Sequence, residues 1–258
     1  MLKSLSFSCP YARVAQPVCA LFALVVWLGG AISAREQIDP RRVSTELRGG
    51  VALGDWKDSS LGAIDRGVLN LALGAANCAA RSGSVSDPVT LTVIDYSKPS
   101  TAKRLWVFDL RSHELLFEEF VAHGQGSGGN LATLFSNEPE THRSSIGLFE
   151  AKDTYIGKNG YSLRLKGLDA GFNDRALERA IVMHGAAYVS EDFARAHGRL
   201  GRSWGCPALP AAVARDVIDR VKGSGLVFAY YPDQRWLTAS KYLGGCSTAS
   251  STSQGADS

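Results

Sequence analysis

A series of short segments rich in β-branched and aromatic residues is the feature that most limits how this chain can fold. Several of them alternate apolar with polar residues, as strands do when one side faces a core. The predicted strands are 89–96, 103–110, 114–123, 146–157, 161–167, 179–185 and 225–231. Hairpin-type turns at 111–113 and 158–160 join neighbouring strands. Short strands separated by turns favour a sandwich or an open barrel over a parallel sheet.

Helical spacing of apolar residues occurs on either side of this series. Apolar residues between Leu61 and Leu71 predict one or two helices ahead of the strands. A second pattern runs from Ala212 to Val221, and Gly223 ends it. We therefore predict a mainly β domain, a β-sandwich or open barrel, with a few peripheral helices.

The ends of the chain differ in composition from the middle. Lys3 and Arg13 precede an apolar run that ends in small residues near Ala34, which is typical of a secretory signal peptide. This apolar run is short for a membrane span, although an uncleaved anchor is the alternative. The expected organisation is a signal peptide (1–34), a helical or irregular segment (35–86), the mainly β domain (87–236) and a disordered polar tail (237–258).

Export changes how the five cysteines are read. Cys9 and Cys19 lie in the predicted signal peptide, which leaves an odd number in the remaining chain. An odd number in an exported protein indicates a free thiol or an intermolecular bond. The sequence permits a bond between Cys78 and Cys246 that would leave Cys206 free, but it does not require one.

Cys206 stands in a narrow setting, "GRSWGCPALP", 22 positions after a strand that ends at His184. A thiolate is a minority species at neutral pH, and a nearby imidazole can take the proton. Gly205 leaves space beside the sulfur, and backbone N–H groups of such a turn can bind an oxyanion. A buried cysteine is often only a small hydrophobe, and a lone histidine is often structural. Together, with glycines beside both, Cys206 and His184 favour a catalytic pair.

This unit resembles the signature of the YkuD-type L,D-transpeptidases, in which a His-Gly strand end is followed by Ser/Thr-x-Gly-Cys. It is most similar to the divergent branch YkuD_2, through "SKPSTAKRLWVFDL", "VAHGQGSGGN", "SNEPETHRSSIG", "RAIVMHGAAYVSEDF" and "GRLGRSWGCPALP". These motifs cover most of residues 95–233 and exclude the N-terminal helical region and the tail.

The resemblance implies a mainly β, sandwich-like catalytic domain and a role for each matching residue. Cys206 matches the nucleophile, His184 the general base, and Gly185 the residue whose carbonyl orients the histidine. Ser203 and Gly205 match the Ser/Thr and Gly of the motif.

The implied donor is a peptidoglycan tetrapeptide stem, cleaved at its third residue with release of D-alanine. The acceptor would be an amine on a neighbouring stem or on an outer-membrane protein. Water as acceptor would give a carboxypeptidase instead. A third reading is a non-catalytic wall-binding domain with a structural cysteine.

The chain also departs from the common motif. Trp204 stands where histidine is usual, and Pro207 and Ala208 replace the usual continuation with Arg or Asn. We expect Trp204 to line the substrate groove, Arg202 to replace the missing cation, and His123 to reach the site from its glycine-rich loop.

The remaining features exclude several functions. A net charge of +3 gives no case for nucleic acid. No HExxH or His-Cys cluster indicates a metal, and no cofactor is expected. The expected location is the periplasm or another extracytoplasmic space, with no membrane span after signal cleavage.

Overall fold

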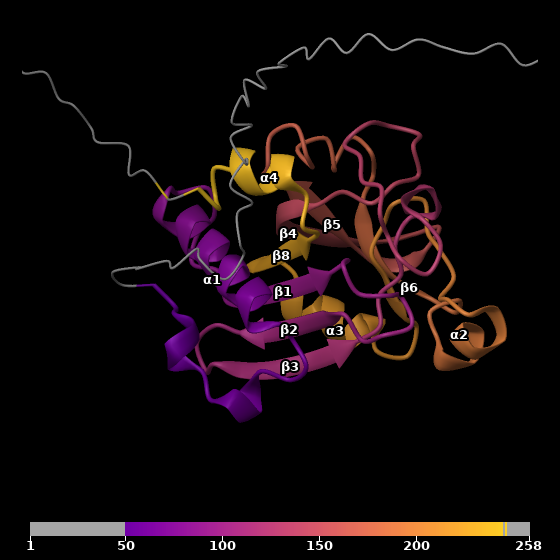
Figure 1. The fold of residues 1–258 in the computed structure, drawn as a ribbon, viewed down its shortest axis with the longest axis horizontal. Helices are drawn as coiled ribbons and strands as arrows, with labels where there is room; N and C mark the ends of the chain where they lie inside the picture. The colour runs from indigo at the N-terminus through magenta and orange to yellow at the C-terminus, as the bar shows by residue number, and fades with distance from the viewer. Residues whose placement is uncertain (1–49, 245, 247–258) are drawn as a thin grey trace, which may run out of the picture. The chain divides into compact units, whose positions relative to one another are not determined.

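One mixed eight-stranded sheet forms the framework of the computed structural model, which describes residues 50–244 and 246 (Figure 1). The strands are β1 (Thr90–Asp95), β2 (Leu105–Asp109), β3 (Glu114–Glu119), β4 (Gly147–Gly157), β5 (Gly160–Gly167), β6 (Val182–Ala186), β7 (Ala208–Pro210) and β8 (Gly225–Tyr230). Their order across the sheet is β3-β2-β1-β8-β4-β5-β6-β7. The pairs β1–β8 and β6–β7 are parallel, and the other neighbours are antiparallel.

The two outer edges of this sheet are joined just beyond the end of β3. The N–H of Ala122 donates to the carbonyl of Ala208 in β7 at 2.8 Å, and the N–H of Ala208 donates back at 3.4 Å. The sheet is therefore a nearly closed barrel, which confirms the predicted fold class.

The helices cover the sheet and its ends. They are α1 (Arg66–Arg81), α2 (Glu191–His197), α3 (Ala214–Val221) and α4 (Gln234–Ala239), with short 3₁₀ turns at Leu53–Asp55, Asp58–Ser60 and Gln125–Ser127. The helices predicted from apolar spacing are α1 and α3. The first begins later than Leu61, because the Asp65 carboxylate accepts from the N–H groups of Gly67 and Val68 and caps the helix there.

Two hydrophobic cores lie on opposite faces of the sheet. Side chains of α1 and α4 pack on one face against β1, β2 and β8, with Trp106 and Phe228 at the centre. Side chains of α3 pack on the other face against β5, β6 and β8, with Met183 and Val227 among them. Consecutive residues of β1 are buried in turn on one face or the other, so the whole strand is buried.

The seven predicted strands are present, whereas β7, α2 and α4 were not predicted. β7 is only three residues long and contains Pro210, so it carries no alternating pattern. The turn that carries Cys206 leads into β7, and the predicted helix α3 follows only after that strand. A disordered tail beginning at 237 is also wrong for its first residues, because 237 lies within α4 and Leu237, Tyr242 and Leu243 are buried. The predicted signal peptide and the rest of the tail lie outside the described residues.

Cys78 in α1 and Cys246 form a disulfide, while Cys206 is free. The pairing that the sequence permitted is thus present. The bond joins positions 168 residues apart, and it fixes the C-terminal end of the described chain to the first helix.

Removal of this disulfide should destabilise the fold, because a cross-link over so long a loop restricts the unfolded chain strongly. We expect the Cys78→Ala/Cys246→Ala variant to lose roughly 3 to 5 kcal/mol of unfolding free energy in urea titrations. A reductant should lower the stability of the wild type and leave that of the double variant unchanged. Equal sensitivity of the two proteins to reductant would contradict the assignment.

Candidate active site

The pairing of β6 with β7 brings His184 close to the turn that carries Cys206. His184 lies in β6 and is paired with Ala208 in β7, two residues after the cysteine. The N–H of His184 donates to the carbonyl of Pro207 at 3.4 Å. Two residues earlier in β6, the N–H of Val182 donates to Cys206 Sγ at 3.5 Å. The 22-residue gap in sequence is therefore closed by direct strand pairing.

The turn that carries the cysteine is fastened at both ends to the segment 122–125. At its start, the N–H of Ser203 donates to the carbonyl of His123 at 3.0 Å, and the N–H of Gln125 donates to the carbonyl of Ser203 at 2.8 Å. At its end, Ala208 pairs with Ala122. The closure of the barrel thus fixes the backbone on either side of Cys206.

Ser203 and Gly205 shape the turn from within. The Ser203 hydroxyl donates to the carbonyl of Cys206 at 2.6 Å and accepts from the N–H of Gly205 at 3.1 Å. Gly205 has a φ of 120°, and a Cβ there would lie 2.8 Å from the carbonyl oxygen of Arg143. Only glycine fits this position without strain.

His184 is oriented by its own strand. Its Nδ1 lies 3.0 Å from the carbonyl oxygen of Gly185, so Nδ1 carries the proton and Nε2 is free to accept one. The predicted contact with Gly185 is present. Burial lowers the pKa of His184, and the hydrogen bond to Gly185 opposes this in part. The imidazole is therefore neutral at pH 7, as a general base must be.

The Cys206 side chain is buried, and the residue is 8% exposed. Burial raises the pKa of the thiol, while the N–H of Val182 and the charge of Arg179 lower it. The thiol in turn faces the carbonyl oxygen of Ala180 at 3.8 Å. At pH 7 Cys206 is thus a neutral thiol and His184 a neutral imidazole.

The three residues predicted to bind substrate have different surroundings. Trp204 is 66% exposed beside the cysteine and stacks on His142, with ring centroids 5.0 Å apart. Arg202 donates to the carbonyl of Gly128 at 2.8 Å, which ties it to the glycine-rich loop. His123 is fully buried, so the prediction that its side chain reaches substrate is wrong. Its Nδ1 accepts from the guanidinium of Arg104 at 2.8 Å instead.

Sequence reasoning missed two side chains that border the cysteine turn. The Ser144 hydroxyl donates to the carbonyl of Gly205 at 3.1 Å and accepts from the N–H of Gly124 at 3.0 Å. The positive charge of Arg179 lowers the pKa of the Cys206 thiol. Arg179 was taken as part of the strand that ends at His184, but β6 begins only at Val182. The sequence did carry a signal for this residue, because Arg179 stands directly before a buried strand that leads to His184.

Within the described part of the chain, no three side chains of His, Cys, Asp or Glu gather as a metal site would require. Among the helices of these same residues, none has the length and hydropathy of a bilayer-crossing segment.

The profile of the L,D-transpeptidase catalytic domain, YkuD_2, matches residues 61–230, more than half of the chain. The chain belongs to this family. The match begins at Leu61, so it includes α1, which the motifs recognised in the sequence did not cover. No curated protein matches the chain.

Solved L,D-transpeptidases are also similar to this protein. One from Mycobacterium smegmatis is 14% identical with a TM-score of 0.36, covering 56% of this chain and 59% of its own. L,D-transpeptidase 1 of Mycobacterium tuberculosis is 14% identical with a TM-score of 0.32, covering 56% and 62%. A complex of the L,D-transpeptidase LdtMt1 with imipenem is 14% identical with a TM-score of 0.35, covering 55% and 59%. The chain spans about three fifths of the length of these proteins.

The buried His123 should make stability depend on pH. Burial, followed by the charge of Arg104, lowers the pKa of His123 from 6.5 to about 4. Between these values the unfolded chain binds a proton that the native protein does not, so stability falls as the pH falls. We expect the wild type to lose about 3 kcal/mol more than His123→Gln between pH 7 and pH 4. Urea titrations at several pH values measure this, and a constant difference between the two proteins would refute it.

Proposed function

We propose that this protein is an exported L,D-transpeptidase that uses Cys206 as nucleophile on peptidoglycan stem peptides. Family membership supports the reaction class. The observation that carries the assignment is the pairing of β6 with β7, which brings His184, with Nε2 unprotonated, beside the strand that follows Cys206. The Cys78–Cys246 disulfide supports export, because such bonds persist in oxidising compartments.

The first half of the reaction forms an acyl-enzyme. His184 Nε2 takes the thiol proton as Sγ attacks the carbonyl carbon of the third stem residue. The C–N bond to D-alanine breaks, and the proton passes from His184 to the departing amine. The oxyanion would be bound by the N–H of Cys206, since Pro207 has no N–H and the N–H of Gly205 is engaged by Ser203.

The second half transfers the acyl group. An acceptor amine attacks the thioester, His184 removes its proton, and the thiol is restored as an amide cross-link forms. The exposed Trp204 would form one wall of the path to the sulfur, with His142 stacked on it. Arg202 would hold the glycine-rich loop at the edge of this path. The acceptor would be a neighbouring stem, with the amine of an outer-membrane protein as the other candidate.

Loss of the thiol should abolish the chemistry while the fold remains. With purified tetrapeptide muropeptides, we expect the wild type to release D-alanine and form dimers, and Cys206→Ala to lose at least about a thousandfold in rate. His184→Ala should lose roughly a hundredfold or more. His197→Ala is the matched control, because His197 lies in α2, where its Nδ1 is 3.0 Å from the carbonyl of Phe193. Mass spectrometry measures both products.

The same assay separates the competing functions. Trimmed monomers without dimers would show that water is the acceptor. Dimer formation by Cys206→Ala at the wild-type rate would refute the proposal. A protein that neither trims stems nor becomes labelled at Cys206 by a carbapenem would be a wall-binding domain.

The pH dependence of kcat/KM should reflect the neutral state of the His184 imidazole. His184 is a base only when unprotonated, and its pKa lies below the ordinary value of 6.5. We therefore expect kcat/KM to persist as the pH falls to 6.5 and to decline only at lower pH. An acid limb at or above pH 7 would mean that the imidazole is not held in this environment.

A further inference from the structure

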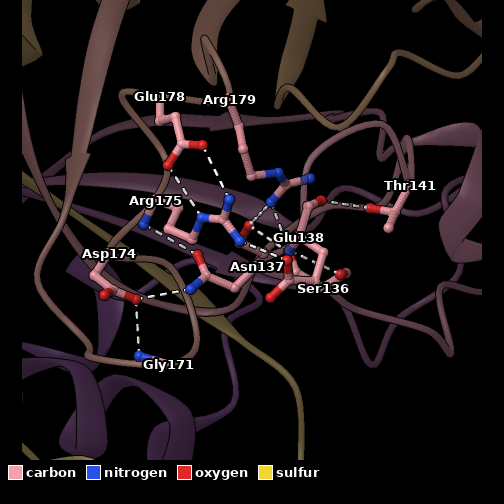
Figure 2. Close-up of polar contacts among 10 residues, drawn as sticks. Ser136, Asn137, Glu138, Thr141, Gly171, Asp174, Arg175, Glu178 and Arg179 are labelled. Carbon is pink, nitrogen blue, oxygen red and sulfur yellow. Dashed lines mark hydrogen bonds and ion pairs between the residues drawn. The ribbon is translucent and has the colours of Figure 1, made fainter.

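Arg179 connects the loop 136–145 to the last turn before β6. One of its terminal nitrogens donates to the carbonyl of Ser136 at 2.6 Å and to the hydroxyl of Ser145. The other donates to the carbonyl of Arg143 at 2.6 Å. Figure 2 shows the guanidinium directed into this loop. The half-buried guanidinium thus donates three hydrogen bonds, and these fix its position.

The groups that Arg179 holds are those that touch the cysteine turn. A Cβ added to Gly205 would meet the carbonyl oxygen of Arg143 first, at 2.8 Å. Ser144, between two residues that Arg179 binds, donates to the carbonyl of Gly205 at 3.1 Å. Fixing Arg143 and Ser145 therefore fixes the surface against which the turn of Cys206 packs.

The backbone that follows Arg179 contacts the sulfur itself. The carbonyl of Ala180 lies 3.8 Å from Sγ, and the N–H of Val182 lies 3.5 Å from it. Ala180 has a left-handed φ of 52°, an unusual conformation for a residue other than glycine. The guanidinium and the thiol therefore belong to one tightly bent stretch of chain.

Besides Arg179, the titratable groups around Cys206 are neutral at pH 7. Burial raises the pKa of Tyr96 to about 12 and that of Tyr188 to about 12. His184 is neutral for the reason given above. Of the described groups that act on the thiol, Arg179 alone carries a permanent positive charge.

We propose that Arg179 is a positioning residue that holds the loop 136–145 against the cysteine turn and stabilises the Cys206 thiolate through its charge. This inference rests on the proposed function, because it concerns the same nucleophile. This role differs from the one that the sequence suggested for Arg202, a cation near a substrate carboxylate, and Arg202 is tied to the carbonyl of Gly128. The position two residues after the cysteine is taken by Ala208, a buried member of the barrel closure.

Arg175 provides a matched control within the same polar network. Its guanidinium binds the carboxylates of Glu138 and Glu178. The backbone N–H of Arg175 donates to the side-chain oxygen of Asn137 (Figure 2). It lies four residues before Arg179 and also contacts the loop 136–145, but its charge is satisfied by these carboxylates. Loss of Arg175 should loosen the loop without removing the charge beside the thiol.

The test measures the ionisation of Cys206 directly, without any cell-wall substrate. The rate of alkylation by iodoacetamide is followed from pH 6 to pH 10 for the wild type, Arg179→Gln, Arg179→Lys and Arg175→Gln. We expect Arg179→Gln to react roughly three- to tenfold more slowly at pH 8, with a higher thiol pKa. Arg179→Lys, which keeps the charge, should restore most of the rate. Arg175→Gln should stay within about twofold of the wild type.

The outcomes distinguish an effect of the Arg179 charge on the thiol from a purely structural role of this side chain. An unchanged thiol pKa in Arg179→Gln would overturn the proposal, and so would equal losses in Arg179→Gln and Arg179→Lys. Arg179→Met supplies a second neutral variant if Arg179→Gln does not fold. If neither folds, Arg179→Lys decides, because a shift of its thiol pKa by more than about one unit would overturn the proposal. Failure of the muropeptide assay with a shifted thiol pKa would instead reject the proposed function alone.

Discussion

Two backbone hydrogen bonds between Ala122 and Ala208 hold the geometry of this protein together, because they join the two edges of the sheet. β7 is too short to be stable as a free edge, and its parallel partner β6 supplies only one side of its pairing. With the second side paired, the chain before β7 has a fixed path. That path contains Cys206. A thiol in the turn just before so short an edge strand would otherwise move relative to His184 on the neighbouring strand.

The chemistry of the site follows from burial more than from charge pairing. Desolvation acts on both members of the pair, lowering the pKa of His184 and raising that of Cys206. Both shifts favour the neutral forms at pH 7, a neutral imidazole and a neutral thiol. Burial therefore lowers the thiolate population, and the charge of Arg179 offsets part of this effect. A buried thiol is also shielded from oxidants.

The sequence was informative where the physics is local. Alternation of apolar residues located every strand from Thr90 to Tyr230 except β7. A strand-end histidine and a cysteine in a glycine turn directed attention to His184 and Cys206, whose catalytic roles belong to the proposed function. Contacts between distant segments were not readable. His123 was assigned to the substrate path because its loop is rich in glycine, but its ring is directed into the core against Arg104. The partners of Arg179 lie 34 to 43 residues away in sequence, so no spacing rule could reveal them.

The disulfide also bears on the order in which the chain must fold. Cys246 is the last of the three described cysteines to be synthesised, and Cys206 precedes it. During that interval Cys78 has a competing partner that would form a non-native bond. Burial of Cys206 by the closing barrel removes this competitor. Correct oxidation is therefore favoured when the sheet assembles around Cys206 before the helix α1 and the C-terminal end of the described chain are joined.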